Sequence, residues 1–309
     1  PQEQQAMIGV GRRNMLINGD MKVSQRGNYT GATTAASDAY FLDRWKVDRN
    51  GTATMEHTTS HDIPGSPAIC KAIKLVQTVT GNNYLGIRQK IEDPTQYVGR
   101  TFTYSGWVRS NTPNARIECF VHGTNQGAIG PNHSGNGEWE FLSFTWTMSG
   151  IPSNNWFVDV FIDSGAYGNV TITAGDYFEA TMLQLEEGKV ATPFEHRSYG
   201  EELALCQRYY QLFEAAACHA SSTTAVEFTY QWNTEMRAAP SVSASAALIV
   251  ERHNITTYTQ SSAAVSATQT TPIAAKFTLP NLSGLTAGNA YSYIGNHSSS
   301  GHIELNAEI

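Results

Sequence analysis

Residues 191–210 read ATPFEHRSYGEELALCQRYY and form the one stretch of the chain with a plain helical pattern. Ser198 and Glu201 have the S-x-x-E spacing of a capping box, in which each side chain binds a backbone N–H of the other residue. Strong helix formers follow the cap and predict a helix within residues 196–212. Its apolar residues form two stripes: Leu203, Cys206 and Tyr210, then Leu205, Tyr209 and Leu212. A helix of about four turns is marginal alone, so the two stripes predict cover on more than one side.

Upstream of this helix, residues 14–195 have the pattern of an antiparallel β-sandwich. About ten short alternating segments are separated by turn residues, and no helical segment lies between them, which excludes a parallel βαβ arrangement. The clearest strand is Thr101–Ser110, with Phe102, Tyr104 and Val108 on one face and Trp107 and Arg109 on the other. Residues 15–23 are expected to form the first strand, and residues 122–138 a long loop. The sequence predicts an all-β chain whose residues 14–195 fold as a jelly-roll β-sandwich.

The remaining segments complete the predicted domain organisation. Residues 1–13 are expected to be a lead-in from a stalk, since the chain opens on Pro-Gln-Glu-Gln-Gln and resembles a piece of something longer. Residues 196–212 form the linker helix, and residues 213–309 a small C-terminal β-sandwich domain. Ser, Thr and Ala dominate this last region, so we expect a thin core that gains stability when subunits pack together.

The composition excludes several classes of function. The formal net charge is -7 and no run of Lys or Arg occurs, which argues against binding to nucleic acid. No apolar run approaches the length of a membrane span, so membrane insertion is not expected. The four cysteines lack C-x-x-C spacing and are expected to be buried free thiols in a protein assembled in cytoplasm.

Two sets of motifs carry a resemblance to a known family. The first set is N-M-L-I-N-G-D at residues 14–20, S-Q-R-G at residues 24–27 and D-R-W at residues 43–45; the second is T-P-F-E-H-R-S-Y-G-E-E-L-A-L-C-Q-R-Y-Y at residues 192–210. Together they resemble a unit that recurs in bacteriophage and prophage tail-fibre proteins, with Ser24 in place of the usual aromatic residue. The region between them resembles a jelly-roll carbohydrate-binding module. The resemblance covers residues 14–211 and implies a homotrimer in the tail fibre of a virion, in contact with other tail or fibre proteins.

Aromatic residues give the most informative candidates for a binding site, because sugars stack their C–H faces on exposed rings. Trp107 and Arg109 share the face of the strongest strand that is opposite its apolar phase. The candidate glycan-binding residues are Trp107, Arg109, Gln89, Asp159 and Asp163 on the sheet, with Trp139 and Tyr167, joined by His133, at its rim. The alternative reading places Trp107, Trp139, Trp146 and Trp156 in the sandwich core.

Jelly-roll carbohydrate modules often hold a structural calcium near their first and last strands, and the resemblance implies the same here. The matching positions are Asp20 and, at the other end, Glu179 or Glu186. Calcium requires six to eight oxygen ligands, and few candidates can be named. The alternative is that residues 18–20 only make a turn.

Catalytic signatures are missing from the sequence. It contains no G-x-S-x-G, H-E-x-x-H or P-loop, and Asp159 and Asp163 stand about 13 Å apart along one strand, too far for most glycosidase pairs. We therefore expect no enzyme, and the resemblance to tail-fibre proteins implies a receptor-binding protein that recognises a bacterial surface glycan, either lipopolysaccharide or capsule. Two rivals stay open: a tailspike-type polysaccharide depolymerase and a purely structural trimerisation tip. The sequence does not decide which β domain contacts the receptor.

Overall fold

The computed structural model of the chain describes residues 12–60, 62–65, 70–121, 126–149, 156–162, 170–213, 216–232, 234–252, 256–293 and 301–309. The chain divides into two compact units, Pro1–Glu202 and Leu203–Ile309. The described residues are almost entirely β-structure, with one α-helix and one short 3-10 helix, η1 (Pro94–Tyr97). None of the helices in this part of the chain is long and apolar enough to cross a membrane.

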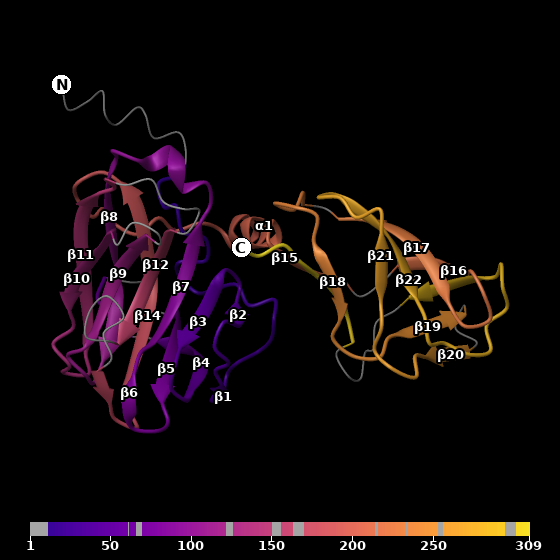
Figure 1. Ribbon diagram of the computed structural model, residues 1–309, viewed down its shortest axis with the longest axis horizontal. Coiled ribbons are helices and arrows are strands. Elements are labelled where there is room, and N and C mark those ends of the chain that lie inside the picture. The colour runs from indigo at the N-terminus through magenta and orange to yellow at the C-terminus, as the bar shows by residue number, and fades with distance from the viewer. Residues whose placement is uncertain are drawn as a thin grey trace. The chain divides into compact units, whose positions relative to one another are not determined.

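The first unit is a jelly-roll β-sandwich of two six-stranded antiparallel sheets (Figure 1). Sheet 1 has the order β1 (Thr33–Thr34), β4 (Ala53–Ser60), β5 (Cys70–Gln77), β14 (Tyr177–Glu187), β8 (Thr101–Ser110) and β11 (Trp139–Thr147). Sheet 2 has the order β10 (Gln126–Asn132), β9 (Ala115–Val121), β12 (Trp156–Ile162), β7 (Leu85–Ile91), β3 (Trp45–Arg49) and β2 (Tyr40–Leu42). A small ladder pairs β13 (Val170–Ile172) with β6 (Gly81–Asn83). The all-β prediction is confirmed. The expected loop at 122–138 is wrong in part, because it contains β10.

The sandwich core lies between the two sheets because each strand alternates its side chains between two faces. Phe102, Tyr104 and Val108 of β8 are buried in this core, as the sequence phases predicted. Trp156 is fully buried there too, and its ring meets that of Phe102 edge-on at 5.1 Å. The opposite face of β8, which carries Trp107, therefore points away from the core.

The expected first strand at residues 15–23 is wrong, and the reason lies in the asparagines of the first motif. Asn14 and Asn18 bond the backbone in place of a strand ladder: Asn14 Oδ1 accepts from the N–H groups of Leu16 and Leu185, at 3.0 and 3.1 Å. Asn18 adopts a left-handed φ of 59°, which asparagine tolerates well. Its side-chain amide donates to the carbonyl of Val23 at 2.8 Å. Residues 14–23 thus form an irregular segment stabilised by side chains.

The motif at residues 192–210 is hydrogen-bonded to the motif at residues 14–20, although the two are far apart in the sequence. Glu195 Oε2 accepts from the backbone N–H of Asn14 at 2.8 Å, and Arg197 Nη1 donates to the carbonyl of Leu16 at 3.0 Å. Glu202 Oε1 accepts from the N–H of Asn18 at 2.6 Å and from Arg197 Nη1 at 3.2 Å. We call this set of bonds the latch. The residues of these two segments that form the latch are therefore structural ones.

The D-R-W motif at residues 43–45 is also structural. Trp45 is fully buried and its indole N–H donates to the carbonyl of Asn18 at 2.8 Å. Asp43 accepts from the backbone and the side chain of Gln25, both at 2.6 Å. Trp45 is thus a structural residue of the sandwich core.

The helix α1 (Tyr199–Gln207) begins at the predicted capping box and ends earlier than predicted. Ser198 Oγ accepts from the N–H of Glu201 at 3.3 Å, and Glu201 Oε2 accepts from the N–H of Ser198 at 2.9 Å. The chain then turns, and a strand begins at Tyr210. Tyr210 and Leu212 are therefore strand residues, so the last member of each expected stripe lies beyond the helix.

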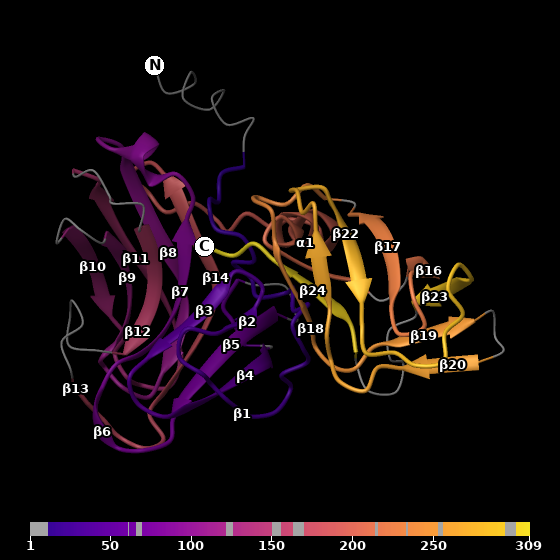
Figure 2. The same ribbon diagram turned by 45° about the vertical axis from the view of Figure 1, so that its right-hand side comes forward.

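The second unit has two antiparallel sheets (Figure 2). The smaller has the order β15 (Tyr210–Phe213), β24 (Ile303–Asn306) and β18 (Ser241–Ala244). The larger has the order β20 (Thr256–Thr259), β19 (Ile249–Arg252), β23 (Ala290–Tyr293), β16 (Ala216–Ala220), β17 (Val226–Gln231), β22 (Ala274–Leu279) and β21 (Ser266–Thr268). Stacked aromatic rings fill the core of this unit, where large aliphatic residues are few. Phe228 stacks on Phe277 with ring centroids 5.1 Å apart, and Phe213 stacks on Tyr230 with centroids 4.5 Å apart. All four cysteines of the chain are free and buried, as predicted.

Candidate functional site

A groove of about 460 Å³ lies on the outer face of sheet 1, the face that carries Trp107. The described residues that line it are Gly65, Ser105, Trp107, Phe141, Met182, Gln184, Ala191, Thr192, Pro193, Phe194 and His196. Strands β8, β11 and β14 supply its floor, and residues 191–196 supply one wall. The groove therefore joins the strongest strand of the sandwich to the segment that opens the second motif.

Aromatic rings dominate the groove. Trp107 of β8 and Phe141 of β11 are cross-strand partners, and their ring centroids are 5.5 Å apart. Phe141 is 47% exposed, which is unusual for so large an apolar side chain, while Trp107 is half-buried. On the wall, the rings of Phe194 and His196 meet edge-on at 5.0 Å. Such partly exposed rings offer flat apolar surfaces to a ligand.

A β-bulge brings Met182 into the groove. The register between β14 and β8 shifts between Thr181 and Gln184, and Met182 has a left-handed φ of 50°. The extra residue re-aims side chains at that point. Gly106 of β8 leaves room for Leu183, the residue after Met182 in the bulge. A Cβ at position 106 would stand 2.4 Å from Leu183 Cδ2.

Glu186 holds the wall of the groove in place. Its Oε1 accepts from the N–H of Thr192 at 2.8 Å and from Gln184 Nε2 at 2.9 Å. Its Oε2 accepts from Thr192 Oγ1 at 2.6 Å. Gln184 Oε1 in turn accepts from the N–H of Glu195 at 2.8 Å. The polar atoms of Gln184 and Thr192 are therefore used in positioning the wall, although both residues line the groove.

Two polar groups in the groove are not used in this way. Ser105 is buried, and in the described part of the chain its hydroxyl makes no hydrogen bond. The ring nitrogens of His196, on the opposite wall, likewise have no hydrogen-bond partner among the residues described. A hydroxyl and an imidazole beside aromatic rings are groups that bind sugar hydroxyls.

Arg109 lies beside the groove and is held by carboxylates. Its Nη2 donates to Glu179 Oε1 at 2.8 Å and its Nη1 to Asp62 Oδ2 at 3.0 Å. Its guanidinium also stands 5.2 Å from the centroid of the Trp139 ring. The hydrogen bond and the charge of Glu179 raise the pKa of Arg109, against the burial that would lower it.

Trp139 is not the rim residue that the sequence predicted. It begins β11 and is buried in a small cluster with Ile63, Cys70, Ala72 and Met182. Its indole N–H donates to Asp62 Oδ1 at 3.0 Å. His133, expected at the same rim, is 1% exposed, and its Nδ1 accepts from the N–H of Gly135 at 2.8 Å.

The expectation that Gln89 and Asp159 share the face of Trp107 is wrong. Both belong to sheet 2, Gln89 on β7 and Asp159 on β12. The amide of Gln89 is bonded on both sides to the backbone of Ile17, each bond 2.8 Å long. The other two candidates, Asp163 and Tyr167, lie outside the described residues.

Asp159 belongs to a buried ionic cluster on the outer face of sheet 2. Arg88 Nη1 lies 2.6 Å from Asp48 Oδ2, and Arg88 Nε lies 3.3 Å from Asp159 Oδ1. Glu118 is the cross-strand partner of Asp159 on β9. Burial raises the pKa of Asp159 to about 8, against the opposing charge of Arg88, and the charge of Glu118 adds to the rise. The sequence placed a carboxylate here but gave no signal of its two acidic neighbours, which come from other strands.

The contacts of Asp20 and Glu179 do not favour calcium. Asp20 Oδ2 is paired with Lys22 Nζ at 2.7 Å, and Glu179 Oε1 with Arg109 and Lys74. Glu186, the alternative, holds the wall of the groove. Among the residues described, no three His, Cys, Asp or Glu side chains stand together as a metal would require. Calcium stays a prediction without support from this arrangement.

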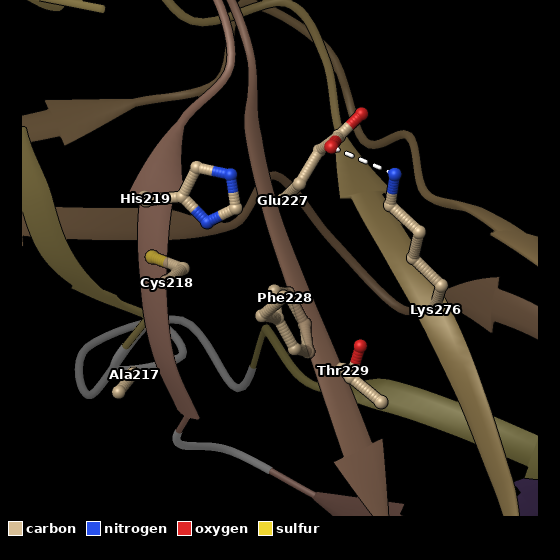
Figure 3. A pocket seen from close by; sticks show the side chains of 7 residues that line it. All are labelled: Ala217, Cys218, His219, Glu227, Phe228, Thr229 and Lys276. Atoms are coloured by element: carbon tan, nitrogen blue, oxygen red, sulfur yellow. Dashed lines mark ion pairs between the residues drawn. The ribbon is translucent and has the colours of Figure 1, made fainter. Parts of the chain in front are cut away.

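A second hollow, of about 380 Å³, lies in the larger sheet of the second unit. It opens where β16 and β17 part, since these strands pair only at Ala220–Val226 and His219–Glu227. Figure 3 shows the ion pair between Glu227 and Lys276 on one side of it, with an N–O distance of 2.9 Å, and Phe228 at its base. This hollow has one aromatic ring, buried, where the groove of the first unit has three partly exposed ones.

Comparisons with known proteins give distant structural likenesses. A scan against protein-family models finds no match, and a search of curated proteins finds none either. Among solved structures, the chain is similar to the enzymatically active domain of tailspike protein 4 of bacteriophage CBA120, with 16% identity and a TM-score of 0.38, over 57% of this chain and 21% of that one. It is similar to TmCBM61 in complex with β-1,4-galactotriose, with 13% identity and a TM-score of 0.33, over 57% of this chain and all of that one. It is also similar to the family 11 carbohydrate-binding module of the Clostridium thermocellum cellulase Lic26A-Cel5E, with 11% identity and a TM-score of 0.30, over 53% and 99%.

Proposed function

We propose that the chain is the receptor-binding part of a phage tail fibre and that its groove binds a bacterial surface glycan without cleaving it. The observation that supports this most directly is the groove itself. Three aromatic residues, Trp107, Phe141 and Phe194, surround a hollow that also holds an unbonded hydroxyl and imidazole. Stacking rings with a few polar groups beside them suit a pyranose, which has apolar C–H faces and a ring of hydroxyls.

The tail-fibre assignment rests on the motifs at residues 14–45 and 192–210. In this proposal the chain acts as a homotrimer in the virion, joined to other tail or fibre proteins. Three copies of a weak site on each fibre raise the overall strength of attachment without new contacts. Light scattering tests the assembly: we expect a mass of about three times 33.7 kDa, and a monomer would contradict it.

Substitutions in the groove test the binding role. Trp107→Ala and Phe141→Ala should each weaken binding on a glycan array about 10- to 100-fold, as loss of a stacked ring removes about 1.4 to 2.8 kcal/mol. Ser143→Ala is the matched control, because Ser143 is exposed on the same face of β11 but does not line the groove. Unchanged binding in both aromatic variants would contradict a site in the groove.

A depolymerase is the second candidate, and one observation favours it. Asp159, with its raised pKa, stands across the strand pair from Glu118, and a protonated carboxyl beside a second one is the arrangement of a glycosidase acid. Both residues are buried and belong to an ionic cluster with Arg88, so we favour a structural role. An assay for new reducing ends on bacterial polysaccharides decides: release that Asp159→Asn abolishes would establish an enzyme.

A further inference from the structure

We propose that the groove selects neutral sugars and discriminates against sugars that carry carboxylate, sulfate or phosphate groups. This inference rests on the proposed function of the groove as a glycan site. It begins with the lining: among the described residues that line the groove, none is Asp, Glu, Lys or Arg. A site for an acidic sugar needs a cation or a set of free N–H donors to replace the water that the anion loses.

The arginines beside the groove are already bonded within the protein, and Arg13 Nη2 donates to the carbonyl of the lining residue Pro193 at 2.6 Å. Arg109 is held by Glu179 and Asp62, at 2.8 and 3.0 Å. Arg197, which follows the wall, is held by Glu195 and Glu202, at 3.0 and 3.2 Å. An acidic ligand would have to compete with these carboxylates for each guanidinium, so it gains little from them.

The negative charge of a carboxylate behind the wall also opposes the binding of an anion. Glu186 is 2% exposed and lies directly behind Gln184 and Thr192, which both line the groove. Its nearest cation is Arg13, whose Nε is 3.6 Å away and whose side chain is 45% exposed, so solvent weakens the compensation. The chain as a whole carries a formal net charge of -7. Repulsion from a buried carboxylate and from the net charge costs an anionic sugar both affinity and association rate.

The groups that remain available are suited to uncharged hydroxyls. The Ser105 hydroxyl can donate and accept a hydrogen bond, and the ring nitrogens of His196 are further partners for hydroxyl groups. Trp107 and Phe141 accept the C–H face of a pyranose. Among its described lining residues, the groove thus has partners for each part of a neutral sugar and no Lys or Arg to pair with an added negative charge.

The test uses matched pairs of polymers: polygalacturonate, alginate and hyaluronan, each native and after reduction of its carboxyl groups to primary alcohols. We expect the full chain to bind the reduced form of at least one pair at least 10-fold more tightly than the native form, and Trp107→Ala to abolish that binding. Tighter Trp107-dependent binding to the native polymers would overturn this inference and leave the proposed function standing. No Trp107-dependent binding to any of the six polymers would count against both.

A second experiment introduces a positive charge into the wall of the groove. Ala191 lines the groove and its neighbour Val190 does not, although Val190 is 72% exposed. Ala191→Lys should strengthen binding to the native polymers about 3- to 10-fold and narrow the preference for the reduced ones, while Val190→Lys should leave the preference unchanged. Equal effects of the two lysines would show that overall charge, and not the groove, sets the selectivity, and would overturn the inference.

Discussion

The backbone N–H of Asn14 donates to Oε2 of Glu195 at 2.8 Å, across 181 residues of sequence. The same carboxylate accepts from the N–H of Arg13 through its other oxygen and pairs with Arg197 at 3.0 Å. Two segments from opposite ends of the first unit are thereby fixed to each other by one side chain.

Glu195→Gln should therefore destabilise the first unit by about 1 to 2 kcal/mol, because charge-assisted bonds to the backbone become neutral ones. Urea unfolding followed by tryptophan fluorescence measures the change. Glu187→Gln is the control, since Glu187 is 55% exposed and pairs only with the exposed Arg100, and such pairs contribute little. Equal losses in the two variants would contradict a latch at Glu195.

The pH dependence of stability should report the buried Asp159. The folded chain holds its proton up to a pKa of about 8, while the unfolded chain releases it near 3.8. Its stabilising contribution is thus fully present below about pH 4 and is lost as the pH rises through 8. Across this window the unfolding free energy of the wild type, relative to Asp159→Asn, should fall by on the order of 1 kcal/mol per pH unit. A difference that stays constant between pH 5 and pH 9 would mean that Asp159 ionises normally.

Glu195 should act in the opposite direction. Burial would raise its pKa, but the hydrogen bonds from the N–H groups of Asn14 and Arg13, with the charge of Arg197, lower it below the ordinary value of 4.5. The stability it contributes is present above that value and is lost as the pH falls through the lowered pKa. Acid unfolding should therefore occur over a broader pH range in Glu195→Gln than in the wild type, and coincident acid transitions would argue against the lowered pKa.

Glu186→Ala should weaken glycan binding while leaving the rings of Trp107 and Phe141 on the strands in place. Removing this carboxylate releases the N–H and hydroxyl of Thr192 and the amide of Gln184, so the wall with Phe194 and His196 loses its support. We expect about a 10-fold loss of affinity, mainly through faster dissociation, measured by surface plasmon resonance at a temperature where the variant is folded. A loss confined to the association rate would point to long-range charge instead of a positioned wall.

Ser198→Ala tests the cap of helix α1. The substitution removes the acceptor for the N–H of Glu201, at a cost of about 1 kcal/mol. Thermal unfolding followed by circular dichroism measures it. Ser198→Asp, which keeps an acceptor at the cap, should restore most of the loss; if it does not, the capping bond is not the cause.

Local features of this fold were predictable, and long-range ones were not. The two faces of β8 and the cap at Ser198 follow from alternation and from a three-residue spacing, which both lie within one element. The alternation of residues 15–23 predicts a strand, but the segment is irregular because the side chains of Asn14 and Asn18 bond the backbone. Asparagines that bond a distant backbone leave no local pattern.

The groove combines residues that the strand pattern predicts with residues that it does not. Trp107 was predicted on the outer face, because its strand fixes the face. Gln89 and Asp159 were grouped with it because alternation gives the face of a strand but not the sheet to which the strand belongs. Phe194 and His196 reach the groove through the bonds of Glu186 to Thr192, and nothing in the sequence spacing reports that contact. One signal was available for Phe141, since β11 carries aromatic residues in both of its phases.

The latch has an evolutionary consequence. Its bonds join residues 13–18 to residues 195–202, so the first unit begins and ends at the same place. A unit with adjacent ends can be inserted into another protein, since both junctions lie where the unit closes upon itself. Recombination at these two junctions would then move the groove and its wall together as one folded piece.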